Sequence, residues 1–98
     1  GELEEFLELY FEELASSEPG LVLHQGELDV PALKRLTVFE QKEVFKRALK
    51  DAGAPVDAET LQKLTELLRS RPGKTVQAAG KLSVQWKGGR LRFTIDNP

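Results

Sequence analysis

The sequence has 98 residues, and its 40% hydrophobic and 31% charged residues are an ordinary mixture for a chain with one hydrophobic core. This composition excludes a disordered chain and a collagen-like chain. A transmembrane protein is also excluded, because no apolar run approaches the roughly 20 residues of a spanning helix. With no cysteine and one histidine, a disulfide framework is excluded and no metal site is expected. The acidic start does not resemble a signal peptide, so we expect a cytoplasmic domain. Because the sequence begins with Gly1 and contains no methionine, we also expect that it is a domain cut from a longer polypeptide.

The net charge of −2 conceals an uneven distribution along the chain. Residues 1–29 contain nine acidic residues and no Lys or Arg. Residues 30–98 therefore contain seven acids and all fourteen bases, a net charge of +7. This asymmetry indicates either a solvated acidic helix beside an ordinary surface or a basic region with a polyanionic partner.

The N-terminal part of the chain predicts a long helix and a short strand. Apolar residues recur at helical spacing from Leu3 to Leu14, with glutamates on the opposite side, so we expect a connecting helix over residues 1–17 that ends before Pro19. The apolar run of residues 21–24 predicts a short strand, and Gly26 marks a turn. A short helical piece then begins around Pro31.

Two further helices follow within residues 21–73. Thr37 and Glu40 have the spacing of a capping box, in which each side chain accepts from the other residue's backbone N–H. That helix extends to about Ala52, where Gly53 ends it. Asp57 caps the next helix, which ends at Pro72-Gly73 and buries four leucines: Leu61, Leu64, Leu67 and Leu68.

After residue 73 the period of apolar residues changes from helical to two. Ala79-Gly80 and Gly88-Gly89 are turn signals, so residues 74–95 predict a three-stranded antiparallel meander. The inward positions are Val76, Ala78, Leu82, Val84, Trp86, Leu91, Phe93 and Ile95. The predicted fold class is therefore α+β, with helices packed on a small antiparallel sheet in a single domain of residues 1–98.

No catalytic constellation is evident in the sequence. Gly73-Lys74-Thr75 resembles the end of a phosphate-binding loop, but the required preceding glycine position is Leu68, and the order of helix and strand is reversed. His24 lies in a short apolar run, which favours a partly buried structural histidine over a general base. The paired glutamates of the first helix face solvent, where nothing separates their pKa values. We expect no catalytic residues in this chain.

Two basic surfaces are candidates for binding a polyanion. At about 100° per residue, three lysines form a ridge along one flank of the helix of residues 38–52: Lys42, Lys46 and Lys50. Arg47 lies further around the same helix. Phe39 projects beside this ridge and could stack on a base or a sugar. The alternative, which we favour, is that Phe39 packs under a neighbouring helix or against a missing domain.

The second candidate is the outer face of the predicted meander. The alternation of the strands places bases and uncharged polar residues on this outer face, and it places no acid there. Trp86 points inward and belongs to the core. A sheet face that resists strand addition would look similar. The outward bases are Lys81, Lys87, Arg90 and Arg92, and Arg71 and Lys74 flank them in sequence.

Several of these residues resemble the substrate-binding domain of tRNA(Ile)-lysidine synthases. The resemblance extends over about residues 28–93. Its first part is a leucine-rich entry, Leu28–Leu33 with Leu36, followed by a basic helix, Gln41–Leu49, which Gly53 closes. Its second part resembles the glycine–lysine entry into terminal β-hairpins: Gly73, Lys74, Thr75, Val76, Gly80, Leu82, Val84, Gly89 and Leu91.

The resemblance implies a non-catalytic module that binds tRNA. Members of this family attach lysine to the wobble cytidine of an isoleucine tRNA in an ATP-dependent ligation. Their catalysis resides in an N-terminal domain with a Ser-Gly-Gly-x-Asp-Ser loop, a string absent here, so ATP and Mg²⁺ would belong to that covalently linked domain. The implied RNA-binding residues are Lys42, Lys46, Arg47, Arg71, Lys74, Lys81, Lys87, Arg90 and Arg92.

Two other interpretations remain open at this point. The order of elements is close to that of a winged-helix DNA-binding domain, whose recognition helix would start at Asp57, although a minimal winged helix lacks the strand predicted around Val76. A protein-interaction module would instead use the acidic first helix against a basic partner and have no nucleic-acid role.

Overall fold

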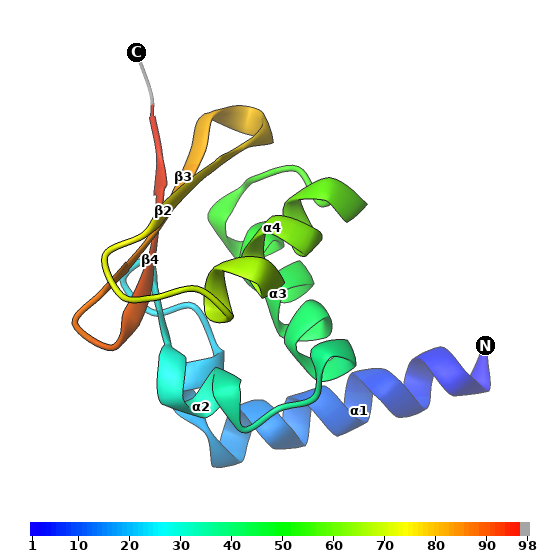
Figure 1. Cartoon of the computed structure of the whole chain (residues 1–98). Helices are drawn as coiled ribbons and strands as arrows, with labels where there is room; N and C mark the ends of the chain where they lie inside the picture. Colours follow the sequence, from blue (N-terminus) through cyan, green and yellow to red (C-terminus); the bar gives the residue numbers. More distant parts are fainter. Residues whose placement is uncertain (97–98) are drawn as a thin grey trace.

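The computed structural model describes residues 1–96 and has the predicted α+β architecture (Figure 1). Helices cover one face of an antiparallel sheet, and the other face is open. The elements in chain order are α1 (Glu2–Ser17), the 3-10 turn η1 (Pro19–Leu21), β1 (Glu27–Asp29), α2 (Val30–Lys34), α3 (Val38–Ala52), α4 (Ala58–Leu68), β2 (Thr75–Ala78), the 3-10 turn η2 (Ala79–Lys81), β3 (Leu82–Lys87) and β4 (Arg90–Ile95).

The sheet has the strand order β1-β4-β3-β2, and every neighbouring pair is antiparallel. Strands β2, β3 and β4 form the predicted meander. The two-residue turn at Gly88 and Gly89 has φ values of 60° and 73°, which glycine adopts without strain and which match the twist of a tight hairpin. The fourth strand, β1, pairs with the edge of β4, so it joins the N-terminal half of the chain to the meander.

The strand predicted at residues 21–24 is wrong in position. Pro19 begins a 3-10 turn that carries Leu21 into the core, where it is 6% exposed. The chain reverses at Gln25 and Gly26, both with positive φ, and the strand forms afterwards at Glu27–Asp29. The reason is tertiary: the free edge of β4 pairs with residues 27–29, a partner more than 60 residues away that local apolar character cannot reveal.

The starts of α3 and α4 and the end of α3 follow the predicted local signals, but α4 ends at Leu68, before the predicted end at Pro72-Gly73. In the capping box of α3, the Thr37 hydroxyl accepts from the Glu40 amide at 3.1 Å, and the Glu40 carboxylate accepts from the Thr37 amide at 2.9 Å. Gly53 follows the helix with φ of 77°. The Asp57 carboxylate caps α4 by accepting from the Thr60 amide at 2.7 Å, and this hydrogen bond lowers the pKa of Asp57.

One contiguous core lies between the helices and the inner face of the sheet. Its largest fully buried side chain is Phe45 of α3, and leucines from α2, α3, α4 and the strands surround it. The predicted alternation is confirmed for β3 and β4: Leu82, Val84 and Leu91 are fully buried, and Trp86 is 5% exposed.

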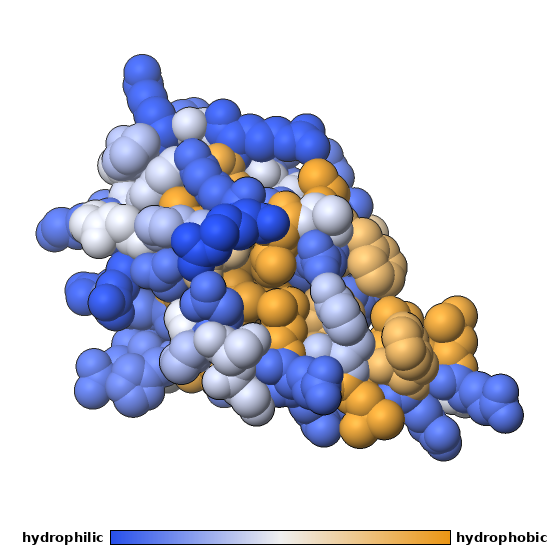
Figure 2. All heavy atoms as spheres, turned by 90° about the horizontal axis from the view of Figure 1, so that it is seen from below, coloured by the Kyte–Doolittle hydropathy of each residue, from blue (hydrophilic) through white to orange (hydrophobic). Residues whose placement is uncertain are grey.

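Helix α1 packs on this core with only part of its apolar stripe. Phe11 is buried, and Leu7 and Leu14 are partly buried. Leu3 and Phe6, nearer the N-terminus, are 70% and 64% exposed. The N-terminal end of α1 projects beyond the body of the molecule (Figure 1), and apolar side chains gather over that end at the right of Figure 2.

We predict that Gly80→Ala destabilises the protein more than Gly53→Ala. Both glycines have positive φ, which costs an L-residue about 1–2 kcal/mol. A Cβ at Gly80 would also lie 2.5 Å from Pro55 Cδ, whereas a Cβ at Gly53 meets nothing within 4 Å. The clash should add about 1–3 kcal/mol, measurable by urea unfolding of both variants. Equal losses of stability would show that η2 moves away from Pro55 without cost.

Candidate nucleic-acid interface

The open face of the sheet carries three of the nine predicted RNA-binding residues, Lys87, Arg90 and Arg92, and two more, Arg71 and Lys74, precede strand β2. Its centre is uncharged and polar, and the pairing register places these residues in rows across β2, β3 and β4: Thr75, Gln77, Ser83, Gln85 and Thr94. Charged residues lie to one side of this centre. Lys87 is directly opposite Arg90, and Arg92 is opposite Gln85.

The meander strands carry no acid on this face, as predicted, but the neighbouring strand β1 brings acids beside them. Strand β1 places Glu27 opposite Arg92 and Asp29 opposite Arg90. The Glu27 carboxylate lies 3.0 Å from the Arg92 guanidinium and 3.6 Å from that of Arg90. Both arginines are thus partly neutralised within the chain, by an acidic residue that the sequence alone did not assign to this face.

Four cations without such compensation gather at one end of the sheet. Backbone hydrogen bonds bring their segments together: the Gly73 amide donates to the Trp86 carbonyl at 2.7 Å, and the Trp86 amide donates to the Lys74 carbonyl at 2.9 Å. We call this group the basic end; within residues 1–96 none of its members has a carboxylate in ion-pair range. Its members are Lys34, Arg71, Lys74 and Lys87.

Lys34 is the member of the basic end that the sequence interpretation missed. It lies on α2, whose first residue, Val30, donates its amide to the carbonyl of Gly89 in the β3–β4 turn at 3.0 Å. The Lys34 ammonium lies 4.7 Å from the centre of the Trp86 ring, a cation–π contact that fixes it beside the sheet. This contact joins residues far apart in the sequence and depends on tertiary packing. No local signal in the sequence therefore indicated that Lys34 belongs to the basic end.

Lys81 lies apart from the other bases of the sheet. It belongs to η2, at the opposite end of β3 from Lys87. At about 3.4 Å per residue, the length of β3 separates the two lysines by roughly 20 Å. The structure therefore does not bring Lys81 together with the basic end.

The bases of α3 lie against the acidic flank of α1. Lys46 pairs with Glu43 at 2.8 Å, and Arg47 donates to the backbone carbonyl of Glu8 at 3.3 Å. The Arg47 guanidinium also lies 5.6 Å from the centre of the Phe11 ring. The groove between the two helices is lined by three acids and three bases: Glu4, Glu8, Glu43, Lys46, Arg47 and Lys50. Acids of α1 thus share a groove with Lys46, Arg47 and Lys50, whereas Lys42 of the predicted ridge does not line it.

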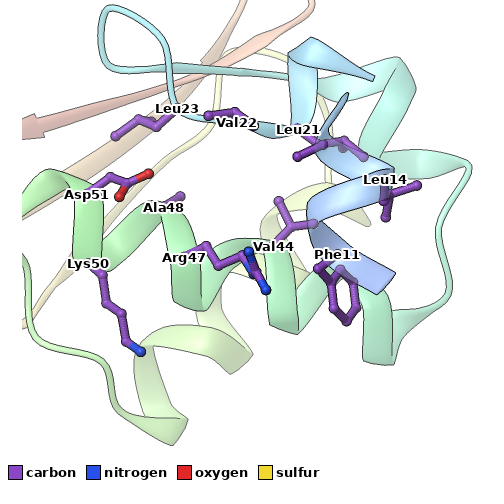
Figure 3. A pocket seen from close by; sticks show the side chains of 11 residues that line it. Phe11, Leu14, Leu21, Val22, Leu23, Val44, Arg47, Ala48, Lys50 and Asp51 are labelled. Atoms are coloured by element: carbon purple, nitrogen blue, oxygen red, sulfur yellow. The ribbon is translucent and has the colours of Figure 1, made fainter. Parts of the chain in front are cut away.

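An apolar hollow of about 200 Å³ lies between α1 and α3 near the η1 turn (Figure 3). Phe11, Leu14 and Val44 form part of its wall, and Arg47 points across it toward Phe11. Lys50 and Asp51 stand at its rim. The hollow is smaller than a usual small-molecule site, which occupies about 300–1,000 Å³.

The remaining titratable groups form local contacts. His24, expected to be partly buried, is exposed, because it sits at the tip of the reversal before Gly26 rather than inside a strand. The Tyr10 hydroxyl donates to the Glu40 carboxylate, which lowers the pKa of Glu40 and raises that of Tyr10. Residues 1–96 contain no group of three His, Cys, Asp or Glu that could hold a metal ion. None of the helices described in this range is long and apolar enough to cross a membrane.

Phe39 does not pack under a neighbouring helix of this chain. Its side chain is 55% exposed in the first turn of α3, next in sequence to Glu40, whose carboxylate accepts from Tyr10 of α1. The favoured prediction of a covered Phe39 is therefore wrong as far as the helices of residues 1–96 are concerned.

Comparison with known proteins found one informative relative. No family model matches the chain, and no solved structure matches it. A tRNA(Ile)-lysidine synthase from Chlorobaculum tepidum is 41% identical over 93 residues, which is 95% of this chain and 28% of that protein. The chain thus spans less than a third of the length of this curated relative. The predicted resemblance is confirmed, and the chain is related over nearly its whole length to a segment of a tRNA(Ile)-lysidine synthase.

Proposed function

We propose that this chain is the tRNA-binding module of a tRNA(Ile)-lysidine synthase and that the basic end of its sheet holds the phosphate backbone. The observation that carries the proposal is the gathering of Lys34, Arg71, Lys74 and Lys87 without acidic partners, in a chain related to a protein of that name. The ligation itself, with its ATP and Mg²⁺, belongs to a covalently linked N-terminal domain in the cytoplasm.

The chemistry of the open face suits a folded RNA. Lys and Arg supply phosphate contacts, which give affinity and position without reading sequence. The uncharged rows around Ser83 and Gln85 offer hydrogen bonds to phosphates and 2′-hydroxyl groups, which an A-form helix displays along its shallow minor groove. Recognition by shape is therefore the mode that this face favours.

The winged-helix interpretation is less well supported. In a winged helix, α4 would enter a DNA groove, but most of its residues are buried against the core. Its exposed positions include Glu59 and Glu66, and Lys63 donates to the Gln77 carbonyl at 3.0 Å. The fold also contains β2, a strand that a minimal winged helix lacks.

The proposal is tested by titrating the domain with tRNA and with duplex DNA of matched length at two salt concentrations. With about five phosphate contacts, affinity for tRNA should fall roughly a hundredfold between 50 and 200 mM salt. Preference for duplex DNA, or no binding to either nucleic acid at low salt, would contradict the proposal.

We predict that Lys74→Gln/Lys87→Gln weakens tRNA binding more than Lys42→Gln/Lys46→Gln. The two pairs remove equal charge, but Lys46 is already paired with Glu43 at 2.8 Å, whereas neither Lys74 nor Lys87 has a carboxylate in ion-pair range within residues 1–96. Each lost phosphate contact should reduce the slope of log affinity against log salt by about one. The four side chains are not fully buried, so melting temperatures should change little. A larger loss in the α3 variant would move the interface to that helix.

We predict that Glu4→Gln/Glu8→Gln raises tRNA affinity about two- to threefold at low salt, because these acids face the α3 bases and repel phosphates. The matched control is Glu2→Gln/Glu13→Gln, which removes the same charge from the other flank of α1. Equal gains in both variants would assign the effect to net charge rather than to the groove, and fluorescence anisotropy with labelled tRNA distinguishes these results.

A further inference from the structure

We propose that Phe39 and Lys42 form a site for one unpaired nucleotide of the RNA, with the base stacked on the Phe39 ring and its phosphate on the Lys42 ammonium. This inference rests on the proposed RNA-binding function and adds a second contact, distinct from the basic end of the sheet. It assigns a ligand to an exposed aromatic side chain whose exposure is not explained by a role in the core or at the sheet.

The Phe39 ring is exposed and its backbone is held in place. The capping box of Thr37 and Glu40 orders the first turn of α3, so the ring projects from a defined helix rather than from a loop. With 55% of the residue exposed, the side chain is accessible to a ligand from solvent. Because the backbone is already ordered, stacking costs only the rotamer freedom of the ring.

The charges around Phe39 favour a phosphate on one side of the ring. Lys42 follows one turn along α3, within the reach of neighbouring helix positions, and it has no carboxylate in ion-pair range among residues 1–96. Lys46 continues the same flank, although it is paired with Glu43 at 2.8 Å. Glu40 lies about 100° away around the helix, where its carboxylate accepts from Tyr10 and from the Thr37 amide.

The other exposed aromatic residues have different surroundings. Phe6 is 64% exposed on α1, where the neighbour one turn away is Glu2 and no Lys or Arg occurs on the helix, whereas Phe39 has both Lys42 and Glu43 one turn away. A nucleotide stacked on Phe6 would meet repulsion at its phosphate. Phe39 is therefore the exposed phenylalanine whose neighbours suit a nucleotide, and Phe6 serves as a matched control for loss of an exposed ring.

The expected ligand is a nucleotide outside a duplex. In a continuous helix the faces of the bases are already stacked on one another, so an aromatic side chain reaches only unpaired bases in loops, bulges and ends. A transfer RNA offers such bases beside its helical arms. Stacking on a ring tolerates any base, so this site adds affinity for unpaired RNA without a strong sequence preference.

The test compares single-stranded and duplex RNA as probes for the same variants. The single-stranded probe is an oligoadenylate of about ten nucleotides, and the second probe is a blunt RNA duplex. Phe39→Ala should weaken binding of the oligoadenylate about tenfold, the loss typical of one base–aromatic stack, and leave duplex binding unchanged. Phe39→Tyr should retain the affinity, and Phe6→Ala should leave binding of both probes unchanged.

The salt dependence identifies the two partners separately. Phe39→Ala should leave the slope of log affinity against log salt unchanged, whereas Lys42→Gln should reduce it by about one. Thermal unfolding checks that the variants remain folded, as expected for an exposed ring.

The failures of this inference and of the proposed function are distinguishable. If both RNAs bind and Phe39→Ala has no effect, the nucleotide site is wrong, the proposed function stands, and Phe39 belongs to the apolar surface that continues over α1. An equal loss with both probes would also overturn the site. If neither RNA binds at low salt, both proposals are overturned.

Discussion

The pairing of β1 with β4 is the contact on which the rest of the structure depends. Three residues, Glu27–Asp29, close the open edge of the meander, and flanking hydrogen bonds from Phe93 to Gly26 and from Val30 to Gly89 extend the junction at both ends. Through this junction the N-terminal half of the chain docks on the C-terminal sheet. Because it joins segments more than 60 residues apart, its entropic cost is repaid only when the leucines of both halves share one core.

The same junction determines the electrostatics of the open face. It places Glu27 between Arg90 and Arg92, and it brings α2 and Lys34 to the turn of the β3–β4 hairpin. Positive charge is therefore weakened along the β1 edge and concentrated beside Lys74 and Lys87. Exposed ion pairs such as these contribute little to stability, so their main effect here is on where an anion can bind.

Helix α1 has two flanks with different surroundings. Its glutamates at positions 4 and 8 face the bases of α3, while Leu3 and Phe6 on the other side remain exposed. The acidic N-terminal third is thus partly an internal counterion for the basic region that follows it. A chain with a net charge of −2 can therefore still carry, at the basic end, cations without acidic partners among residues 1–96.

Local physics determined most of the elements from the sequence. The capping box at Thr37, the glycine at position 53 and the Gly88-Gly89 turn each act within a few residues, so the sequence alone predicted the helix start, its end and the hairpin. The alternation that buries Trp86 and exposes Lys87 is equally local, because a strand turns successive side chains to opposite faces. Three of the predicted site residues, Lys87, Arg90 and Arg92, were correctly expected on the outer face of the sheet.

Only the tertiary structure decided which charges meet. The strand expected at residues 21–24 formed at 27–29, because pairing with β4 and not local apolar character selected it. That choice brought Glu27 onto the open face, drew Lys34 to Trp86, and set the acids of α1 against the bases of α3. The composition gives the number of charges but not their positions in space. Contacts between residues far apart in the sequence form only when the hydrophobic core has packed.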